Sequence, residues 1–219
     1  MTLPRPAIHP LGESALTLTW GTAVSAELNA HVHAATAAIR NADLGCIEEL
    51  VPGYAALTVY YNPLHTDCDG LSDQLMALLS GADGASLARP AGRDHLIPVH
   101  YDGDDLSEVA RLTGLSRDEV VRRHADPWYH VYLLGFAPGF AYLGDLDPAL
   151  VLARHGSPRK RVPAGSVAIA GAQTAIYPLD TPGGWHLIGR TDLVLFDPEA
   201  APPARLQPGD RVRFEPVGE

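Results

Sequence analysis

The segment PRKRVPAGSVAIAGAQTAIYPLDTPGGWHLIGRT, residues 158–191, is the most informative part of this chain for fold class. It contains the short apolar runs SVAIAG, TAIYPL and WHLIG, separated by glycine and proline. Flanking runs, HVYLLGF (130–136) and LVLF (193–196), continue the pattern on both sides. Short apolar runs with turn residues between them are typical of strands in a closed barrel or a sandwich. The sequence therefore predicts an all-β unit in the second half of the chain.

The first half has a different pattern, in which strands and helices alternate. Leu16, Leu18 and Trp20 alternate with polar residues, and AALTVYY (55–61) forms a second predicted strand. A helix is predicted after Ser25, and another after Asp67 or Asp69. We therefore expect a small N-terminal α/β sandwich domain, and an α+β class for the whole chain.

A boundary between the halves is predicted at GADGASLARPAGR, residues 81–93, which is rich in Gly, Ala and Pro and has no periodicity. The predicted domains are residues 1–85 and 93–219. The second begins with the strand-like HLIPVHY (95–101) and continues with EVARLTGLSRDEVVRRH (108–124), which has a helix–turn–helix pattern. A helical hairpin packed on a sheet is favoured over a DNA-binding unit, because the protein is acidic.

Composition excludes several classes of function. The net charge of -10 disfavours nucleic acid and membrane as partners. Cys46 and Cys68 form no disulfide framework or metal motif, and the N-terminus lacks an apolar signal segment, so a cytoplasmic location is expected. The histidines show no metal-binding spacing, and no metal is predicted. A P-loop, a dinucleotide fingerprint and a nucleophile elbow are all missing, so ATP would need an unfamiliar loop or a partner.

Polar and aromatic side chains are dense in the same part of the sequence as the glycines. Arginine can bind a carboxylate or phosphate with two hydrogen bonds, and Gln173 suits an amide group. Glycines let backbone N–H groups approach a ligand, but they also turn tight barrel corners. The residues alone leave both interpretations open. The segment contains Arg159, Arg161, Gln173, Thr174, Tyr177, Thr181, Trp185, His186 and Arg190.

Long motifs in the chain resemble a known family. LGFAPGFAYLGDLDP (134–148), the segment 158–191 and LQPGDRVRF (206–214) resemble the family of KipI and the B-type subunit of 5-oxoprolinase, which is also described as allophanate hydrolase subunit 1-like. GESALTLTWG (12–21) and IEELVPGYAALTVYYNP (47–63) are similar to its first domain. The resemblance implies a C-terminal cyclophilin-like β-barrel after the N-terminal domain.

The resemblance also implies a function. It points to the B-type subunit of an ATP-dependent 5-oxoprolinase, which opens 5-oxoproline to L-glutamate together with A-type and C-type subunits and is inactive alone. ATP with Mg²⁺ is the implied co-substrate, bound by this chain or by a partner subunit. Two alternatives stay open: a KipI-like inhibitor of a sensor histidine kinase, and subunit 1 of an allophanate or urea-pathway amide hydrolase.

Roles for individual residues follow as hypotheses. Arg159 and Arg190 would bind phosphate or the substrate carboxylate, and Gln173 would recognise the lactam amide. Tyr177 and Trp185 would wall the pocket. His130 or His186 would transfer a proton, because histidine titrates near neutral pH. The predicted substrate-binding set is Arg159, Gln173, Thr174, Tyr177, Trp185 and Arg190, and the predicted catalytic set is His130 and His186.

Overall fold

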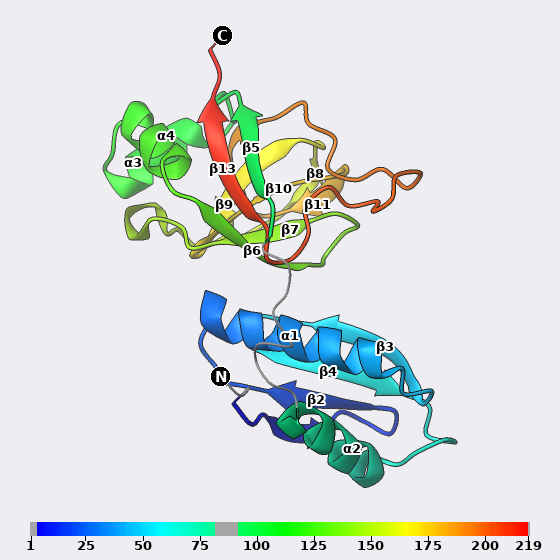
Figure 1. Cartoon of the computed structure of the whole chain (residues 1–219). Coiled ribbons are helices and arrows are strands. Elements are labelled where there is room, and N and C mark those ends of the chain that lie inside the picture. Colours follow the sequence, from blue (N-terminus) through cyan, green and yellow to red (C-terminus); the bar gives the residue numbers. More distant parts are fainter. Residues whose placement is uncertain (1–3, 82–91, 219) are drawn as a thin grey trace. The chain divides into compact units, whose positions relative to one another are not determined.

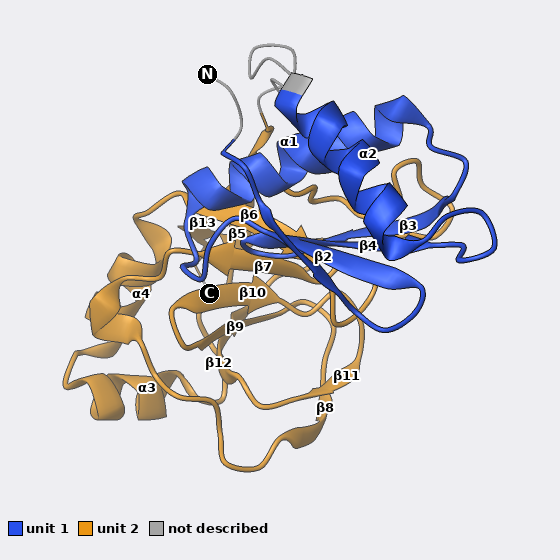
Figure 2. Cartoon of the chain, turned by 90° about the horizontal axis from the view of Figure 1, so that it is seen from below, with its two compact units in different colours: residues 1–90 blue, residues 91–219 orange. Residues whose placement is uncertain are grey.

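The computed structural model describes residues 4–81 and 92–218. The chain forms two compact units, residues 1–90 and 91–219 (Figure 2). Most of the predicted linker, residues 82–91, lies outside the described residues. The predicted α+β class is confirmed, since each unit combines helices with a sheet.

The N-terminal unit is one antiparallel sheet with a layer of two helices on one face (Figures 1 and 2). The sheet order is β1-β2-β4-β3. Apolar residues at alternate positions of β2 and β4, such as Leu16 and Val59, pack against Val32 of α1 and Leu75 of α2. The elements are β1 (Ala7–Pro10), β2 (Ala15–Thr19), α1 (Ala26–Ala42), β3 (Ile47–Pro52), β4 (Ala56–Tyr61) and α2 (Cys68–Gly81).

Both helices of this unit begin where polar side chains cap them. The Ser25 hydroxyl accepts a hydrogen bond from the Leu28 N–H at 3.2 Å. The Asp67 carboxylate accepts one from the Gly70 N–H at 2.7 Å, so Asp67 rather than Asp69 precedes the second helix. These contacts satisfy N–H groups that have no partner inside the helix, which is why the helices start at these positions.

The C-terminal unit contains most of the strands and two short helices. Its elements are β5 (Asp94–Val99), α3 (Leu106–Thr113), α4 (Arg117–Ala125), β6 (Tyr129–Leu134), β7 (Ala141–Gly144), the 3₁₀ helix η1 (Pro148–Leu150), β8 (Arg159–Val162), β9 (Ser166–Ala170), β10 (Gln173–Ile176), β11 (Thr181–Gly183), β12 (His186–Arg190) and β13 (Arg211–Pro216). The predicted strand LVLF is absent as a regular strand, because only Phe196 forms an isolated bridge, with Ala204.

Seven of these strands form a sheet that closes on itself as a barrel. Their order is β12-β9-β10-β7-β6-β13-β5, and β5 and β13 are the parallel pair. The two ends of the sheet meet at His100 and Arg190, whose N–H groups donate to each other's carbonyl oxygens at 2.9 and 2.8 Å. Closure removes the free sheet edges that would otherwise expose unpaired backbone groups.

The helix pair of residues 108–124 is a hairpin that packs on the barrel. Helix α3 packs against β12 and α4 against β13, through buried Val109 and Val120. Arg122 and Arg123 both form ion pairs with Glu119, at 2.8 and 2.7 Å, so neither presents a free cation. This arrangement agrees with the hairpin interpretation. In the part of the chain that the structure describes, no helix has both the length and the apolar character needed to cross a membrane.

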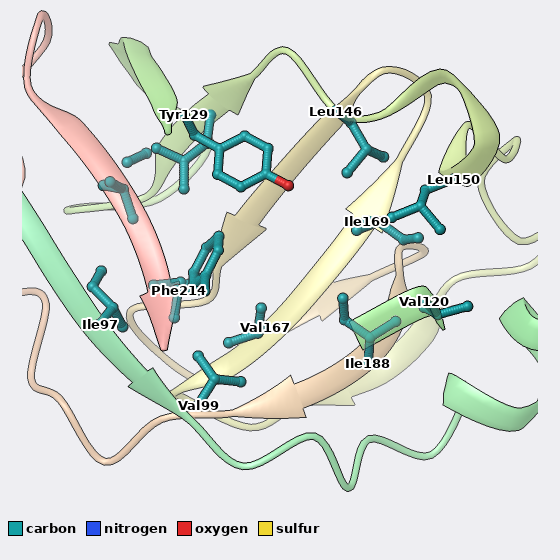
Figure 3. Packing of buried hydrophobic residues seen from close by; sticks show 14 of the residues in the cluster. Ile97, Val99, Val120, Tyr129, Leu146, Leu150, Val167, Ile169, Ile188 and Phe214 are labelled. Carbon is teal, nitrogen blue, oxygen red and sulfur yellow. The ribbon is translucent and has the colours of Figure 1, made fainter. Parts of the chain in front are cut away.

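Side chains that alternate between the two faces of the barrel strands form two separate apolar clusters. On β9, Val167 and Ile169 face the barrel interior, which Figure 3 shows with Tyr129 and Phe214. The intervening Ala168 and Ala170 belong to a second cluster on the outer face of the same strands. Successive side chains in a strand point to opposite faces, so a run that is buried at every position must be covered on both sides.

Candidate functional site

The outer cluster is rich in aromatic rings. The Phe140 ring centroid lies 5.0 Å from Tyr142, 5.3 Å from Tyr177 and 5.8 Å from Trp185, each in an edge-to-face arrangement. These contacts are favourable beyond simple burial and hold the rings in fixed orientations. Val162 of β8 packs into the same cluster, so the two-stranded sheet of β8 and β11 covers part of it.

A hollow of about 290 Å³ opens beside these rings. We call it the aromatic hollow, and it is lined by Phe136, Phe140, Tyr142, Arg154, Pro158, Tyr177, Pro182, Gly183, Gly184 and Trp185. Burial raises the pKa of the Tyr142 and Tyr177 hydroxyls, so both stay protonated at neutral pH. A mostly apolar cavity with a few polar groups is the usual form of a small-molecule site.

Backbone strain holds one ring at the edge of this hollow. Phe136 has a φ of 68°, in the left-handed region, although it carries a bulky side chain. Its ring is 63% exposed and lies 5.2 Å from the Phe140 ring. The turn is closed by hydrogen bonds from Gly135 N–H to the Phe140 carbonyl and from Phe140 N–H to the Ala137 carbonyl. Such strain is unfavourable and is concentrated at functional sites in proteins.

Arg154 supplies the positive charge of the aromatic hollow. Its guanidinium carbon lies 5.7 Å from the Trp185 ring centroid, in cation–π geometry. Within residues 4–81 and 92–218, Arg154 forms no ion pair with a carboxylate. This guanidinium is therefore available for an anionic ligand, and the aromatic rings can pack against the ligand's apolar part.

Arg159 is held differently, by an ion pair with Asp105. One of its guanidinium nitrogens lies 2.5 Å from the Asp105 carboxylate, and another lies 3.5 Å from the Trp185 carbonyl oxygen. Burial alone would raise the pKa of Asp105, but hydrogen bonds from the Leu187 N–H and from Arg159 outweigh it and lower that pKa. The charge of Arg159 is thus neutralised inside the protein, unlike that of Arg154.

The predicted site residues fall into separate places. Tyr177 and Trp185 line the aromatic hollow. Arg190 lines a different hollow, of about 640 Å³, together with Arg117, and pairs with Asp102 at 2.9 Å. His130 lies on β6, with its ring 4.9 Å from Tyr132.

The remaining predicted residues are buried or lie on strands. Gln173 begins β10 and pairs with Ala170 of β9. The Thr174 hydroxyl is fully buried and bonds to the His124 ring and to the Ala168 carbonyl. His186 is 4% exposed, and its Nε2 donates to the Ala153 carbonyl at 2.8 Å.

Sequence reasoning missed several residues that the fold brings to this region. Arg154 lies four residues before the segment 158–191, and the density of basic residues around it is the available signal. Phe140 and Tyr142 lie in the Gly-aromatic stretch 130–144, in which the sequence assigns neither residue a role. Asp105 precedes α3, more than 50 positions from its partners, so no local pattern identifies it.

Comparison with known proteins gives a consistent family relationship. The family model described as "Carboxyltransferase domain, subdomain C and D" matches residues 6–206. A Bacillus subtilis (strain 168) protein, named as the B-type subunit of 5-oxoprolinase, is 39% identical over 226 residues, covering 98% of this chain and 94% of the relative. An Escherichia coli O157:H7 protein of the same name is 44% identical over 184 residues, covering 82% of this chain and 83% of the relative.

Solved structures share the fold. The crystal structure of TTHA0988 matches with a TM-score of 0.82 and 40% identity; the match covers 94% of this chain and 40% of that one. This chain therefore corresponds to less than half of TTHA0988. The Pyrococcus horikoshii protein PH0987 matches with a TM-score of 0.57 and 41% identity, covering 97% of this chain and 98% of that one. The Kluyveromyces lactis urea amidolyase, 18% identical with a TM-score of 0.74, shows a likeness of fold alone.

Proposed function

Because the chain belongs to the family of 5-oxoprolinase B-type subunits, within the carboxyltransferase domain C and D group, we propose that it is the B-type subunit of an ATP-dependent 5-oxoprolinase. Its Bacillus subtilis relative of that name aligns over nearly its full length. The observation in the structure that supports this proposal is the aromatic hollow beside Arg154, which has no carboxylate partner among the described residues.

The chemistry explains why ATP is needed. An amide is stabilised by resonance and is a poor electrophile. Attack of the lactam oxygen on the γ-phosphoryl group of ATP releases ADP and activates the ring carbon. Water then adds to that carbon, and the carbon–nitrogen bond breaks as the nitrogen gains a proton. A second water releases phosphate from the resulting acyl phosphate and leaves glutamate.

The aromatic hollow fits the substrate half of this reaction. 5-Oxoproline is a small ring with one carboxylate and one amide. In this proposal the Arg154 guanidinium binds the carboxylate with charge-assisted hydrogen bonds. The rings of Trp185 and Tyr142 pack against the methylene groups of the ligand and exclude water. Arg190 is a weaker candidate for this role, because Asp102 already neutralises it.

ATP and Mg²⁺ enter the proposal as co-substrates of the assembled enzyme. The Bacillus subtilis relative is named as a subunit, and the partners that we propose for this chain are a C-type and an A-type subunit. We place the nucleotide in the complex formed with these partners. The chain alone is then expected to be inactive even with ATP, because it supplies the pocket for the lactam without the site that holds the nucleotide.

A related substrate is the second candidate. A Saccharomyces cerevisiae protein named urea amidolyase is 30% identical over 127 residues, although the match covers 7% of that protein. The discriminating experiment gives 5-oxoproline or allophanate, with ATP and Mg²⁺, to the chain mixed with its partner subunits. ADP release that depends on 5-oxoproline supports the proposal, and release that depends on allophanate alone overturns it.

A further inference from the structure

Three side chains that could bind a metal come together in the C-terminal unit. They are Asp105, His155 and His186, and one potential ligand atom from each lies within 4.8 Å of the others. Asp105 precedes α3, His155 lies in the loop before β8, and His186 begins β12. The histidine and aspartate spacing in the sequence gives no hint of this cluster, because the residues are 50 and 31 positions apart.

His186 offers one nitrogen that the protein does not use. Its Nε2 donates to the Ala153 carbonyl at 2.8 Å, so in the neutral ring Nδ1 carries the lone pair. Nδ1 is buried and has no hydrogen-bond partner among the described residues, although the side chain is only 4% exposed. An unsatisfied buried acceptor is unfavourable and calls for a ligand. A ring whose other nitrogen donates to a backbone carbonyl is also how histidine is commonly oriented toward a metal.

Asp105 is already fixed in a ligand-like position. Its Oδ1 is held by Arg159, and its Oδ2 accepts from the Leu187 N–H at 2.7 Å. These contacts keep the carboxylate ionised, as the lowered pKa of Asp105 indicates. The second lone pair of Oδ2 faces His155 Nε2 across a long hydrogen bond, where an ion could take its place.

Asp105 and His155 form a long hydrogen bond whose length also matches the spacing of two metal ligands. Asp105 Oδ2 and His155 Nε2 are 3.4 Å apart. Two ligands at zinc distances in a tetrahedral site are separated by roughly 3.4 Å. The pair of the same kind elsewhere in the unit, His95 Nε2 and Asp210 Oδ2, lies at 3.0 Å, an ordinary hydrogen-bond length.

We propose that Asp105, His155 and His186 form a binding site for a first-row divalent cation of the Zn²⁺ class. Two imidazoles and one carboxylate are a ligand set that Zn²⁺ accepts, with the fourth position left for water. His155 is partly exposed, which gives an ion a route from solvent. Arg159 adds a nearby positive charge, so the site binds less tightly than a set of three ligands without a cation.

The proposal is independent of the proposed 5-oxoprolinase activity, and its test needs no substrate. The purified full-length chain is stripped with a chelator, and Zn²⁺ binding is measured by calorimetry. Co²⁺ is then added as a spectroscopic probe, because its visible absorption reports tetrahedral coordination.

The variants are His155→Ala and His186→Gln. The controls are His95→Gln, from the hydrogen-bonded pair, and His65→Ala, from an exposed surface position. Far-ultraviolet circular dichroism checks that each variant is folded.

We expect one bound Zn²⁺ per chain. With Co²⁺ we expect intense absorption bands in the middle of the visible range. Both signals should weaken at least tenfold in His155→Ala and His186→Gln and stay unchanged in the two controls. His155→Ala removes a partly exposed side chain, so it keeps the test decisive if His186→Gln does not fold. No binding to the folded wild-type chain, or equal binding by wild type and His155→Ala, would overturn the proposal.

Discussion

The His124 ring nitrogen Nε2 lies 2.8 Å from the Thr174 hydroxyl in the middle of the barrel. Thr174 donates its proton to the Ala168 carbonyl at 3.0 Å, so it accepts from His124 Nε2–H. The other ring nitrogen, Nδ1, then accepts from the Tyr101 hydroxyl at 2.7 Å. This chain of hydrogen bonds satisfies a buried imidazole only in its neutral form, and burial lowers the pKa of His124 to about 3.

The buried His124 predicts a loss of stability in acid. The unfolded chain takes up a proton on this ring near pH 6.5, whereas the folded chain resists it down to about pH 3. The contribution to stability is therefore present above about pH 6.5 and lost as pH falls below it, by up to about 1.4 kcal/mol per pH unit. Urea denaturation between pH 7.5 and pH 5 measures this slope. It should be shallower in His124→Gln than in wild type and unchanged in the exposed His9→Gln control, whereas equal slopes in all three would refute the assignment.

Arg159 is predicted to stabilise the fold. Replacing it in Arg159→Met removes the guanidinium and leaves the nearly buried Asp105 carboxylate without its cation. We expect a loss of about 1–3 kcal/mol in the free energy of unfolding at neutral pH, because a buried charge without a partner is costly. The loss should shrink in acid, once the pH falls through the lowered pKa of Asp105 and the carboxylate is protonated in the wild-type protein as well.

The control for this change is Arg161→Met, on the same strand. Its partner Asp180 and its own side chain are both largely exposed, so the free energy of unfolding should change little. Chemical denaturation of both variants measures the difference. Equal stability of Arg159→Met and wild type would show that the ion pair with Asp105 contributes nothing.

Arg154 is predicted to bind the substrate carboxylate. In the assembled enzyme, Arg154→Gln should raise the KM for 5-oxoproline roughly 10-fold to 100-fold, the effect expected when a charge-assisted hydrogen bond is lost. The kcat should change less, because the contact is present in both ground and transition states. Arg161→Gln, exposed on β8, is the matched control and should leave KM unchanged. An unchanged KM in Arg154→Gln would move substrate binding away from the aromatic hollow.

Gly183 is predicted to set the size of the aromatic hollow. A Cβ atom at this position would collide with the Tyr177 hydroxyl. The Tyr177 ring is 1% exposed and packed against Phe140, so it has little room to move. Gly183→Ala should therefore lower activity in the assembled enzyme. Gly156→Ala, where an added Cβ meets no atom within 4 Å, is the control. Full activity of Gly183→Ala would argue against a ligand in this hollow.

Local sequence patterns predicted much of the fold. Alternation identified β2 and β4, and the helix–turn–helix pattern of residues 108–124 identified α3 and α4. The structure adds the cap of α4, where the Ser116 hydroxyl accepts from the Glu119 N–H at 3.1 Å. LVLF was wrong as a strand because its backbone pairs only locally, through the Phe196–Ala204 bridge and the Leu195 carbonyl, which accepts from the Arg205 N–H at 2.9 Å. Leu195 is buried in the core while its segment stays irregular.

The site was harder to predict, because it depends on which face of a strand each residue occupies. Tyr177 and Trp185 were predicted as walls of the substrate pocket; both line the aromatic hollow, and their role toward a substrate stays a prediction. Arg159 and Arg190 carry the expected charge, but Asp105 and Asp102 pair with them across long sequence separations. Pairings of this kind arise from barrel closure, which no window of sequence contains. Arg154 lies outside the segment 158–191, yet its guanidinium is the one that lies over the Trp185 ring at the aromatic hollow.

The most direct measurement is the ATP-dependent formation of glutamate from 5-oxoproline by this chain mixed with its A-type and C-type partners, compared with the same mixture from which this chain is omitted. We expect glutamate and ADP in equal amounts from the complete mixture. We expect none from this chain alone and none when this chain is left out. Glutamate formation at the same rate without this chain would contradict its assignment as a required subunit.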